Sequence, residues 1–322
     1  MARTLVTGGC GFLGRKLAER LVADLPDIDL VLADQAPPPA DWKLDHDRLE
    51  LLTGDVTDRS FIEQMMTDDV DTVFHLASVV SAGAEQNFDL GYAVNLLGTI
   101  AVLERCREVA DATGRPPMVV FTSSLATYGS GAGNPVVDAT ALRPETSYGV
   151  QKAAAELLLN DYHRKGFIDG RGLRLPTVVV RPGKPNLAAS GFASGIVREP
   201  LQGIDMVCPV SADTVMAVIS PRRVIDAFVR IVELDAAALG PDRTVLLPGL
   251  AMSMSEAIEA TRAEAGGRDL GTVSFLPDPD VQRIIDSWPP SIVAERAEAL
   301  GLVGDRSVAA IVRQHIEDEL ED

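Results

Sequence analysis

The sequence predicts a doubly wound α/β fold, in which helices cover both faces of a parallel sheet, and three observations support this prediction. A glycine-rich turn joins the first apolar segment to a segment with helical periodicity. Apolar runs and helical segments then alternate through the first half of the chain. Hydroxyl side chains follow the apolar run 118–121, and ligands of such sheets bind beyond the carboxyl ends of the strands.

Composition limits the classes of function. The 322 residues suffice for one large domain or two modest ones. Acidic residues outnumber basic ones 47 to 29, and the net charge of −18 opposes binding to nucleic acid or to an anionic membrane. No export segment is visible, and no apolar run approaches the roughly 18 residues of a membrane span. The three scattered cysteines favour a reducing cytoplasm and provide neither a disulfide framework nor a metal site.

The glycine-rich turn is the segment Thr7 to Gly14, TGGCGFLG. Glycines at such positions let the backbone turn sharply and approach a pyrophosphate, which the N-terminus of the following helix attracts. This pattern predicts a Rossmann dinucleotide site. The residues assigned to it in this turn are Gly8, Gly11, Phe12, Leu13 and Gly14.

A second apolar strand, 30–33, ends at Asp34, twenty residues after Gly14. An acid at this position can hydrogen-bond the adenosine ribose. Its carboxylate would repel a 2′-phosphate, and the adjacent Gln35 supplies no cation. We therefore expect NAD rather than NADP.

The ends of the next two strands also border the predicted cofactor site. Asp55 and Val56 follow strand 49–52, and Asp55 either binds the adenine amino group or caps the next helix. Strand 73–77 ends in Leu76 and Ala77, and the small residues Ala77 and Ser78 would let the cofactor pass close.

Two polar residues near this site have competing interpretations. His75 lies within an apolar strand without an adjacent acid, which favours a core histidine over a catalytic one. Asn95 opens a helical segment and either orders water, holds a neighbouring loop near the cofactor, or caps its helix.

Tyr148 and Lys152 stand four residues apart in a predicted helix and therefore lie one turn apart on the same face. A free phenol has a pKa of about 10, and a nearby ammonium lowers it. Ser124 follows strand 118–121 and places a hydroxyl at the same edge of the sheet. Tyr-x-x-x-Lys occurs by chance in many helices, but the preceding dinucleotide turn favours a catalytic site.

Together with segments 95–99, 128–129 and 181–183, these motifs resemble the extended short-chain dehydrogenase/reductase family. The resemblance implies that Ser124 polarises the substrate, that Tyr148 is the acid/base, and that Lys152 assists it and reaches the nicotinamide ribose. It also implies that Pro182 borders the cofactor. A homodimer formed through the helices of Asn95 and Tyr148 is expected on the same ground.

Departures from the family pattern limit which of the family's activities this sequence is expected to have. Family dehydratases carry a threonine and an acidic pair at the active hydroxyl, whereas Leu125 and Ala126 follow Ser124 here. Family epimerases acting on nucleotide sugars usually show an aromatic pair and an asparagine after the strand of Arg181, whereas this chain reads RPGKPN. The run 181–209 is instead similar to family dehydrogenases that act on D-erythronate.

This similarity implies NAD-dependent oxidation of the C2 hydroxyl of D-erythronate, a four-carbon sugar acid, to the 2-oxo acid. Tyr148 would take the hydroxyl proton while hydride passes to NAD. Lys184 and Arg198 could supply charge for the carboxylate, and Ser81 and Asn186 could supply hydrogen bonds. A surface charge or a turn former explains each of these residues equally well.

Two other functions fit the same motifs. A nucleotide-sugar epimerase would keep NAD tightly bound and show no net reduction of added cofactor. A non-catalytic NAD-sensing protein would need no base, so the presence of Ser124, Tyr148 and Lys152 argues against it.

We predict an NAD-binding domain of residues 1–182 plus 215–235 and a smaller C-terminal substrate lobe of residues 183–214 plus 236–322. Ser220-Pro221 opens a helix that we expect to pack on the NAD-binding domain. Ser253 to Glu256 forms a capping box that opens another helix.

Overall fold

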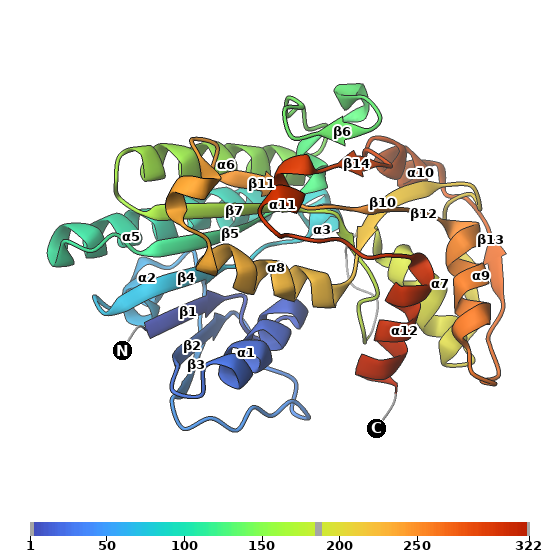
Figure 1. Cartoon of the computed structure of the whole chain (residues 1–322), viewed down its shortest axis with the longest axis horizontal. Helices are drawn as coiled ribbons and strands as arrows, with labels where there is room; N and C mark the ends of the chain where they lie inside the picture. The colour runs from blue at the N-terminus through green and yellow to red at the C-terminus, as the bar shows by residue number, and fades with distance from the viewer. Residues whose placement is uncertain (1–2, 184–188, 321–322) are drawn as a thin grey trace.

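Seven parallel strands form the main sheet of the protein, which we describe from a computed structural model of residues 3–183 and 189–320 (Figure 1). Their order is β11-β7-β5-β4-β1-β2-β3, and all neighbouring pairs are parallel. The chain order reverses between β1 and β4, where doubly wound sheets open a crevice. This confirms the predicted fold class. The strands are β1 (Arg3–Thr7), β2 (Asp29–Asp34), β3 (Leu49–Thr53), β4 (Val70–His75), β5 (Met118–Ser124), β7 (Asp169–Leu175) and β11 (Thr244–Leu246).

Helices cover both faces of this sheet, because successive residues of a strand point to opposite sides. In β2, Leu30 and Leu32 join one apolar core, and Val31 joins the other. The first core lies against α1 (Phe12–Asp24) and α8 (Pro221–Glu233). The second lies against α2 (Arg59–Met65), α5 (Thr99–Thr113) and α6 (Ser147–Arg164).

The helix predicted from Asn95 starts earlier than the sequence suggested. The short helices α3 (Ser81–Gln86) and α4 (Phe88–Gly91) are followed by a π-helical segment, η1 (Tyr92–Gly98), which runs directly into α5. Asn95 lies inside η1 and so does not cap a helix. π-Helical turns are frequent at functional sites, and this one borders the cleft described below.

A smaller lobe lies beside the sheet, at the right of Figure 1. Its own apolar core is separate from the two cores of the sheet. Its strands are β8 (Thr177–Val178), β9 (Met206–Cys208), β10 (Val215–Ile219), β12 (Leu250–Ser253) and β13 (Val273–Phe275). Its helices are α7 (Gly191–Leu201), α9 (Met254–Glu264), α10 (Pro279–Asp286) and α12 (Val308–Glu319).

Short elements connect these layers. Strand β6 (Val136–Val137) pairs with β14 (Ile292–Val293), so the long loop after β5 is joined to the C-terminal region. The remaining short helices are η2 (Leu125–Thr127), η3 (Ser130–Ala132), η4 (Ala236–Leu239) and α11 (Glu295–Ala299).

Two predicted helix starts have the expected local chemistry. The Ser220 hydroxyl accepts a hydrogen bond from the Arg223 amide (3.3 Å), and Pro221 is the first residue of α8. The Ser253 hydroxyl accepts a hydrogen bond from the Glu256 amide (3.0 Å) at the start of α9. Each cap satisfies one of the amides that a helix N-terminus leaves unpaired.

Two strands lie on the opposite side of the predicted domain boundary. Strand β10, assigned to the NAD-binding domain, belongs to the small sheet β12-β10-β8. Strand β11, assigned to the lobe, is the edge strand of the main sheet beside β7. Both are short apolar runs of the same kind, so their partners are decided by long-range packing rather than by local sequence. Helix α8 does pack against α1, as expected.

Strand β7 was not recognised in the sequence, because its residues, DGRGLRL, look like a polar turn. Arg171 and Arg174 are nevertheless buried there, with exposed fractions of 3% and 5%. Arg171 pairs with Asp169, and Arg174 pairs with Glu156 of α6. Paired charges can occupy the interior of a sheet where unpaired ones cannot.

Candidate active site

The glycine turn after β1 packs too closely on neighbouring backbone to hold side chains, and Gly8, Gly11 and Gly14 line a cleft. Gly8 has φ 69°, and a side chain there would place Cβ 2.8 Å from the Ala77 amide nitrogen. At Gly14 a Cβ would lie 2.4 Å from the Gly8 carbonyl oxygen. The N-cap of α1 is Gly11, which offers no side-chain cap to the first-turn amides. These features fit the pyrophosphate of a dinucleotide.

One end of the cleft is lined by the residues predicted to bind adenosine. The Asp34 carboxylate accepts a hydrogen bond from the Cys10 amide (3.1 Å), which places it beside the glycine turn. The Asp55 carboxylate accepts from the Thr57 amide (2.8 Å), whereas the side chain that caps α2 is Asp58. Capping of this helix therefore does not explain Asp55. The cavity lining includes Gly8, Gly11, Asp34, Asp55, Val56, Leu76 and Ala77.

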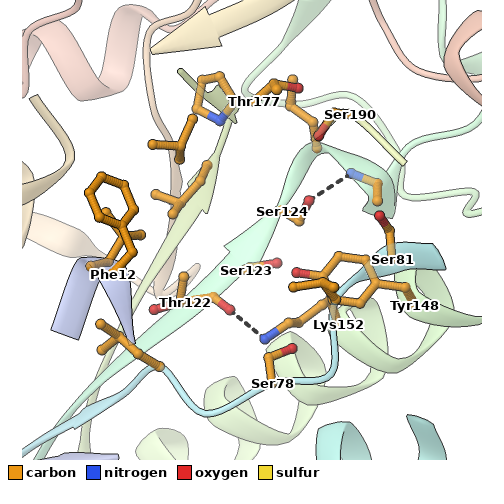
Figure 2. Close-up of a pocket in the computed structure, with 18 of the residues that line it drawn as sticks. Phe12, Ser78, Ser81, Thr122, Ser123, Ser124, Tyr148, Lys152, Thr177 and Ser190 are labelled. Carbon is orange, nitrogen blue, oxygen red and sulfur yellow. Dashed lines mark hydrogen bonds between the residues drawn. The ribbon is translucent and has the colours of Figure 1, made fainter. Parts of the chain in front are cut away.

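The other end of the cleft holds the proposed catalytic residues (Figure 2). It shares Gly8, Gly11, Leu76 and Ser78 with the adenosine end, so the two cavities form one elongated cleft. Ser81, Ser124 and Tyr148 lie together, with Phe12 across the cavity from them. The lining also includes Leu13, Gly14, Thr122, Lys152, Thr177, Arg181, Ser190 and Trp288.

Tyr148 is brought to Ser124 by close packing of the start of α6. At Gly149 an added Cβ would lie 2.0 Å from the Ala126 carbonyl oxygen, so this helix contacts the backbone just after Ser124. Burial raises the pKa of Tyr148, while hydrogen bonding to Ser78, the charge of Arg181 and hydrogen bonding to Ser124 oppose the increase. The pKa of Tyr148 is thus raised overall in this structure, whereas a lowering by the neighbouring lysine was expected from the sequence.

Lys152 is buried one turn further along α6. Its ammonium nitrogen donates to the Thr122 carbonyl oxygen (2.9 Å) and lies 5.7 Å from the centre of the Tyr148 ring. Burial lowers the pKa of Lys152 to about 7, against the opposing charge of Glu156. An amine with such a pKa can exchange a proton near neutral pH.

Asn95 holds the loop that joins the two cavities. Its side-chain oxygen accepts hydrogen bonds from the Val79 amide (2.8 Å) and the Ser78 hydroxyl (3.0 Å). Its side-chain nitrogen donates to the Val79 carbonyl (2.9 Å) and to Gln151 (2.7 Å). Among the alternatives considered for Asn95, this geometry favours the loop-holding one.

His75 is a buried core residue in this structure. Its two ring nitrogens lie 2.7 Å from the Thr7 hydroxyl and 2.9 Å from the Thr99 hydroxyl. Burial lowers its pKa to about 3, and the charge of Lys152 adds to the effect. The imidazole therefore stays neutral and joins β1, β4 and α5.

The residues predicted to bind substrate do not all meet at the cleft. Ser81 does, and its hydroxyl accepts a hydrogen bond from the Ala189 amide (3.2 Å). Arg198 does not line the cleft, because its guanidinium is buried within the lobe and donates to the Arg181 carbonyl (2.6 Å) and to Glu199. Pro182 is also outside the cavity lining. Lys184 and Asn186 lie outside the described residues.

Several lining residues were not identified as site residues in the sequence. Thr177, Ser190 and Trp288 come from three separate segments, and no local motif marks them. Arg181 belongs to segment 181–183 of the family resemblance, but the sequence alone assigned no role to its side chain. Its guanidinium is largely buried, which lowers its pKa, and the charge of Tyr148 opposes this. Its position in the cleft distinguishes it from Arg198.

Comparison with known proteins agrees with this architecture. Residues 4–243 match the model of the NAD dependent epimerase/dehydratase family. The chain belongs to this family. It is also 46% identical to D-erythronate dehydrogenase of Cupriavidus necator, covering 98% of both chains. Identity to D-erythronate dehydrogenase of Haemophilus influenzae is 38%, covering 99% of this chain and all of that one.

A solved structure described as a nucleoside-diphosphate-sugar epimerase from Agrobacterium tumefaciens is 39% identical, with a TM-score of 0.92, covering 99% of this chain and 94% of that one. UDP-glucose 4-epimerase of Thermus thermophilus, in complex with NAD, shares the fold at 22% identity and a TM-score of 0.78, covering 99% and 100%. Family membership confirms the predictions of an extended short-chain dehydrogenase/reductase, of an oxidoreductase and of NAD as its cofactor. The cleft lined by Gly8, Gly11 and Gly14 at the start of α1 fits that cofactor.

Two further observations concern the described part of the chain. None of its helices is both long and apolar enough to cross a bilayer. Within residues 3–183 and 189–320, no group of three or more histidine, cysteine, aspartate or glutamate side chains is arranged to hold a metal ion.

Proposed function

We propose that this protein oxidises the C2 hydroxyl of D-erythronate to the 2-oxo acid with NAD. The observation that carries the proposal is one cavity in which Ser124, Tyr148 and Lys152 face a second cation, Arg181. Similarity to two D-erythronate dehydrogenases along the whole chain supports the substrate. A four-carbon polyhydroxy acid matches a cavity that offers a cation and several hydroxyls.

In our proposal Arg181 binds the substrate carboxylate, in place of Arg198, which does not line the cleft. Its Nε donates to the Val178 carbonyl (3.2 Å), and among the described residues its two terminal nitrogens have no hydrogen-bond partner. A buried guanidinium is stabilised by an anion, and its planar shape suits a carboxylate. Ser81, Thr177 and Ser190 lie in the same cavity and are placed to contact the substrate hydroxyls.

Tyr148 acts as the base in this proposal and takes the proton of the C2 hydroxyl, while Ser124 holds the reacting oxygen. Bound NAD supplies the hydride acceptor. The glycine turn would hold its pyrophosphate, Asp34 its adenosine ribose, and Lys152 its nicotinamide ribose. A proton on Lys152 adds positive charge near Tyr148 and favours the phenolate during the reaction.

The direct test is to follow NADH formation with purified protein, NAD and a panel of four- to six-carbon sugar acids. D-Erythronate should give the highest kcat/KM, and NADP should replace NAD poorly because of Asp34. Acids that differ only in the configuration at C2 or C3 serve as matched controls. Equal rates with every acid, or none with any, would contradict the proposed substrate.

The rival function is a nucleotide-sugar epimerase, since the Agrobacterium tumefaciens structure bears that description. An epimerase would retain NAD through purification and interconvert a nucleotide sugar without net NADH formation. Mass spectrometry of the purified protein and incubation with UDP-sugars distinguish the two. Ser124, Tyr148 and Lys152 are compatible with both reactions, so the decision lies with the substrate cavity.

We also propose that two copies associate through α6 and the segment that precedes α5. Leu157 on α6 is 68% exposed, and Phe88 and Leu97 on the neighbouring elements are 56% and 59% exposed. Exposed apolar side chains gathered on adjacent helices are typical of interfaces. Light scattering should give twice the monomer mass, and Leu157→Glu should give a monomer.

We place this enzyme in the cytoplasm, because its three cysteines are unpaired thiols.

A further inference from the structure

A buried ion pair lies directly behind the catalytic end of the cleft. Glu156 of α6 and Arg174 of β7 have exposed fractions of 3% and 5%. The Arg174 guanidinium donates to both carboxylate oxygens of Glu156, with a distance of 3.0 Å from Nε to Oε1. Neither side chain lines the cleft. The catalytic proposal gives this pair no role.

The pair is bonded to residues on both sides of Ser124. Upstream, the Ser123 hydroxyl donates to the Glu156 carboxylate. Downstream, Arg174 donates to the Tyr128 hydroxyl (2.7 Å) and lies over its ring at 5.1 Å. The turn η2 lies between these two anchors, and Ser124 is its N-cap residue. The ion pair therefore fixes both ends of the short segment that carries the Ser124 hydroxyl.

The same pair ties this segment to the helix of the other catalytic residues. Tyr148, Lys152 and Glu156 are spaced four residues apart and share one face of α6. Lys152 donates to the carbonyl of Thr122, and Glu156 accepts from the adjacent Ser123. Two successive residues of β5 are thus held by two successive turns of α6.

Stability alone is a weak reason for such an arrangement. A buried ion pair often contributes little net stability, because the cost of removing both charges from water offsets their attraction. An apolar pair could fill the same space. The directional contacts to Ser123 and Tyr128 are what an apolar pair would lack.

We propose that Glu156 and Arg174 form a positioning unit that sets Ser124 against Tyr148 and Lys152 for catalysis. The inference rests on the proposed function of this site only through the roles of Ser124 and Tyr148. Neither Glu156 nor Arg174 contacts the substrate. Loss of the unit lowers turnover, because a displacement of about 1 Å at a reacting group can reduce the rate about 100-fold.

The test compares a neutral pair with a matched control on the same strand. Glu156→Leu/Arg174→Met removes both charges together, and with them the acceptor of the Ser123 hydroxyl and the donor to Tyr128, and so leaves no unpaired buried charge. Ser123→Ala removes just the upstream anchor. The control is Arg171→Met, which also removes a buried arginine of β7, but from contacts to Asp169 and to the carbonyls at the end of α8.

We expect the neutral pair to lower kcat about 100-fold and Ser123→Ala to lower it about 10-fold, with the Kd for NAD and the substrate KM within about threefold of wild type. Arg171→Met should lower the melting temperature and leave kcat unchanged. Wild-type kcat in the folded neutral-pair variant, or an equal loss of kcat in Arg171→Met, would overturn the proposal.

If the neutral pair fails to fold, Ser123→Ala decides alone, and unchanged kcat in that variant overturns the inference. The comparison uses whichever substrate the wild-type enzyme turns over. A wild-type enzyme that epimerises a nucleotide sugar and ignores D-erythronate would refute the proposed function, and the kcat ratios would still test the positioning unit.

Discussion

The two ends of the cleft are built in different ways. The cofactor end depends on backbone shape within one short segment, where side chains at Gly8 and Gly14 would collide with neighbouring backbone. The catalytic end depends on side chains, and its lining comes from β5, α6 and the lobe as well as from the glycine turn. The first kind of site is local in sequence, whereas the second requires the complete fold.

The two ends of the cleft also differ in the free energy needed to bury their charged groups. A glycine cradle needs no buried charge, whereas the catalytic end keeps Lys152 and Arg181 largely out of water. Burial of charge opposes folding and shifts pKa values, which is typical of functional sites. Substitutions should therefore have different signatures at the two ends.

The largest effect is expected at Tyr148. Tyr148→Phe removes the proposed proton acceptor and should lower kcat about 100-fold or more, while the Kd for NAD stays nearly unchanged. Steady-state kinetics and NAD titration measure both quantities. Retained activity would remove Tyr148 from the mechanism. It would also show that the catalytic end of the cleft does not depend on this side chain.

Arg181→Gln should act on the substrate rather than on the cofactor. Loss of a charged hydrogen bond to the carboxylate should raise KM for the sugar acid roughly 10- to 100-fold, with a smaller change in kcat. Arg181→Lys keeps the charge but not the planar fork, so its KM should be intermediate. An unchanged KM in Arg181→Gln would assign the carboxylate to another group.

Gly8→Ala tests the cofactor end and has a matched control in Gly114→Ala. Both glycines have φ 69°, but an added Cβ at Gly8 meets the Ala77 backbone at 2.8 Å, whereas at Gly114 nothing lies within 4 Å. Each substitution should cost about 1–2 kcal/mol of backbone strain. Gly8→Ala alone should also weaken NAD binding, by about tenfold or more. Equal NAD affinity in both variants would contradict the cradle.

Lys152→Met should raise the melting temperature by a few degrees at pH 6 while it lowers activity. The pKa of Lys152 in the folded state is about 7, below its ordinary value of 10.5. The ammonium therefore opposes folding fully below pH 7, and this cost fades as the pH rises from about 7 to 10.5. The gain from Lys152→Met should fade over the same range. A lower melting temperature at pH 6 would show that the hydrogen bond to Thr122 and the charge of Glu156 outweigh burial.

Local sequence alone was sufficient to predict the glycine turn and the starts of two helices. The spacing of the glycines, the acid at the end of strand 30–33 and the capping residues Ser220 and Ser253 act within a few residues of where they stand. Their chemistry is a property of the backbone nearby. For this reason the fold class, the cofactor and the family could all be predicted before the structure was known.

Tertiary structure alone decided the neighbours of distant segments. Strands β10 and β11 look alike in sequence and joined different sheets, and β7 was hidden because its arginines looked like surface residues. Arg198 is buried in the lobe and donates to Glu199, whereas Arg181 lines the cleft. Spacing along a chain determines which residues can share a helix face or a turn, but the direction of a side chain depends on what packs against it.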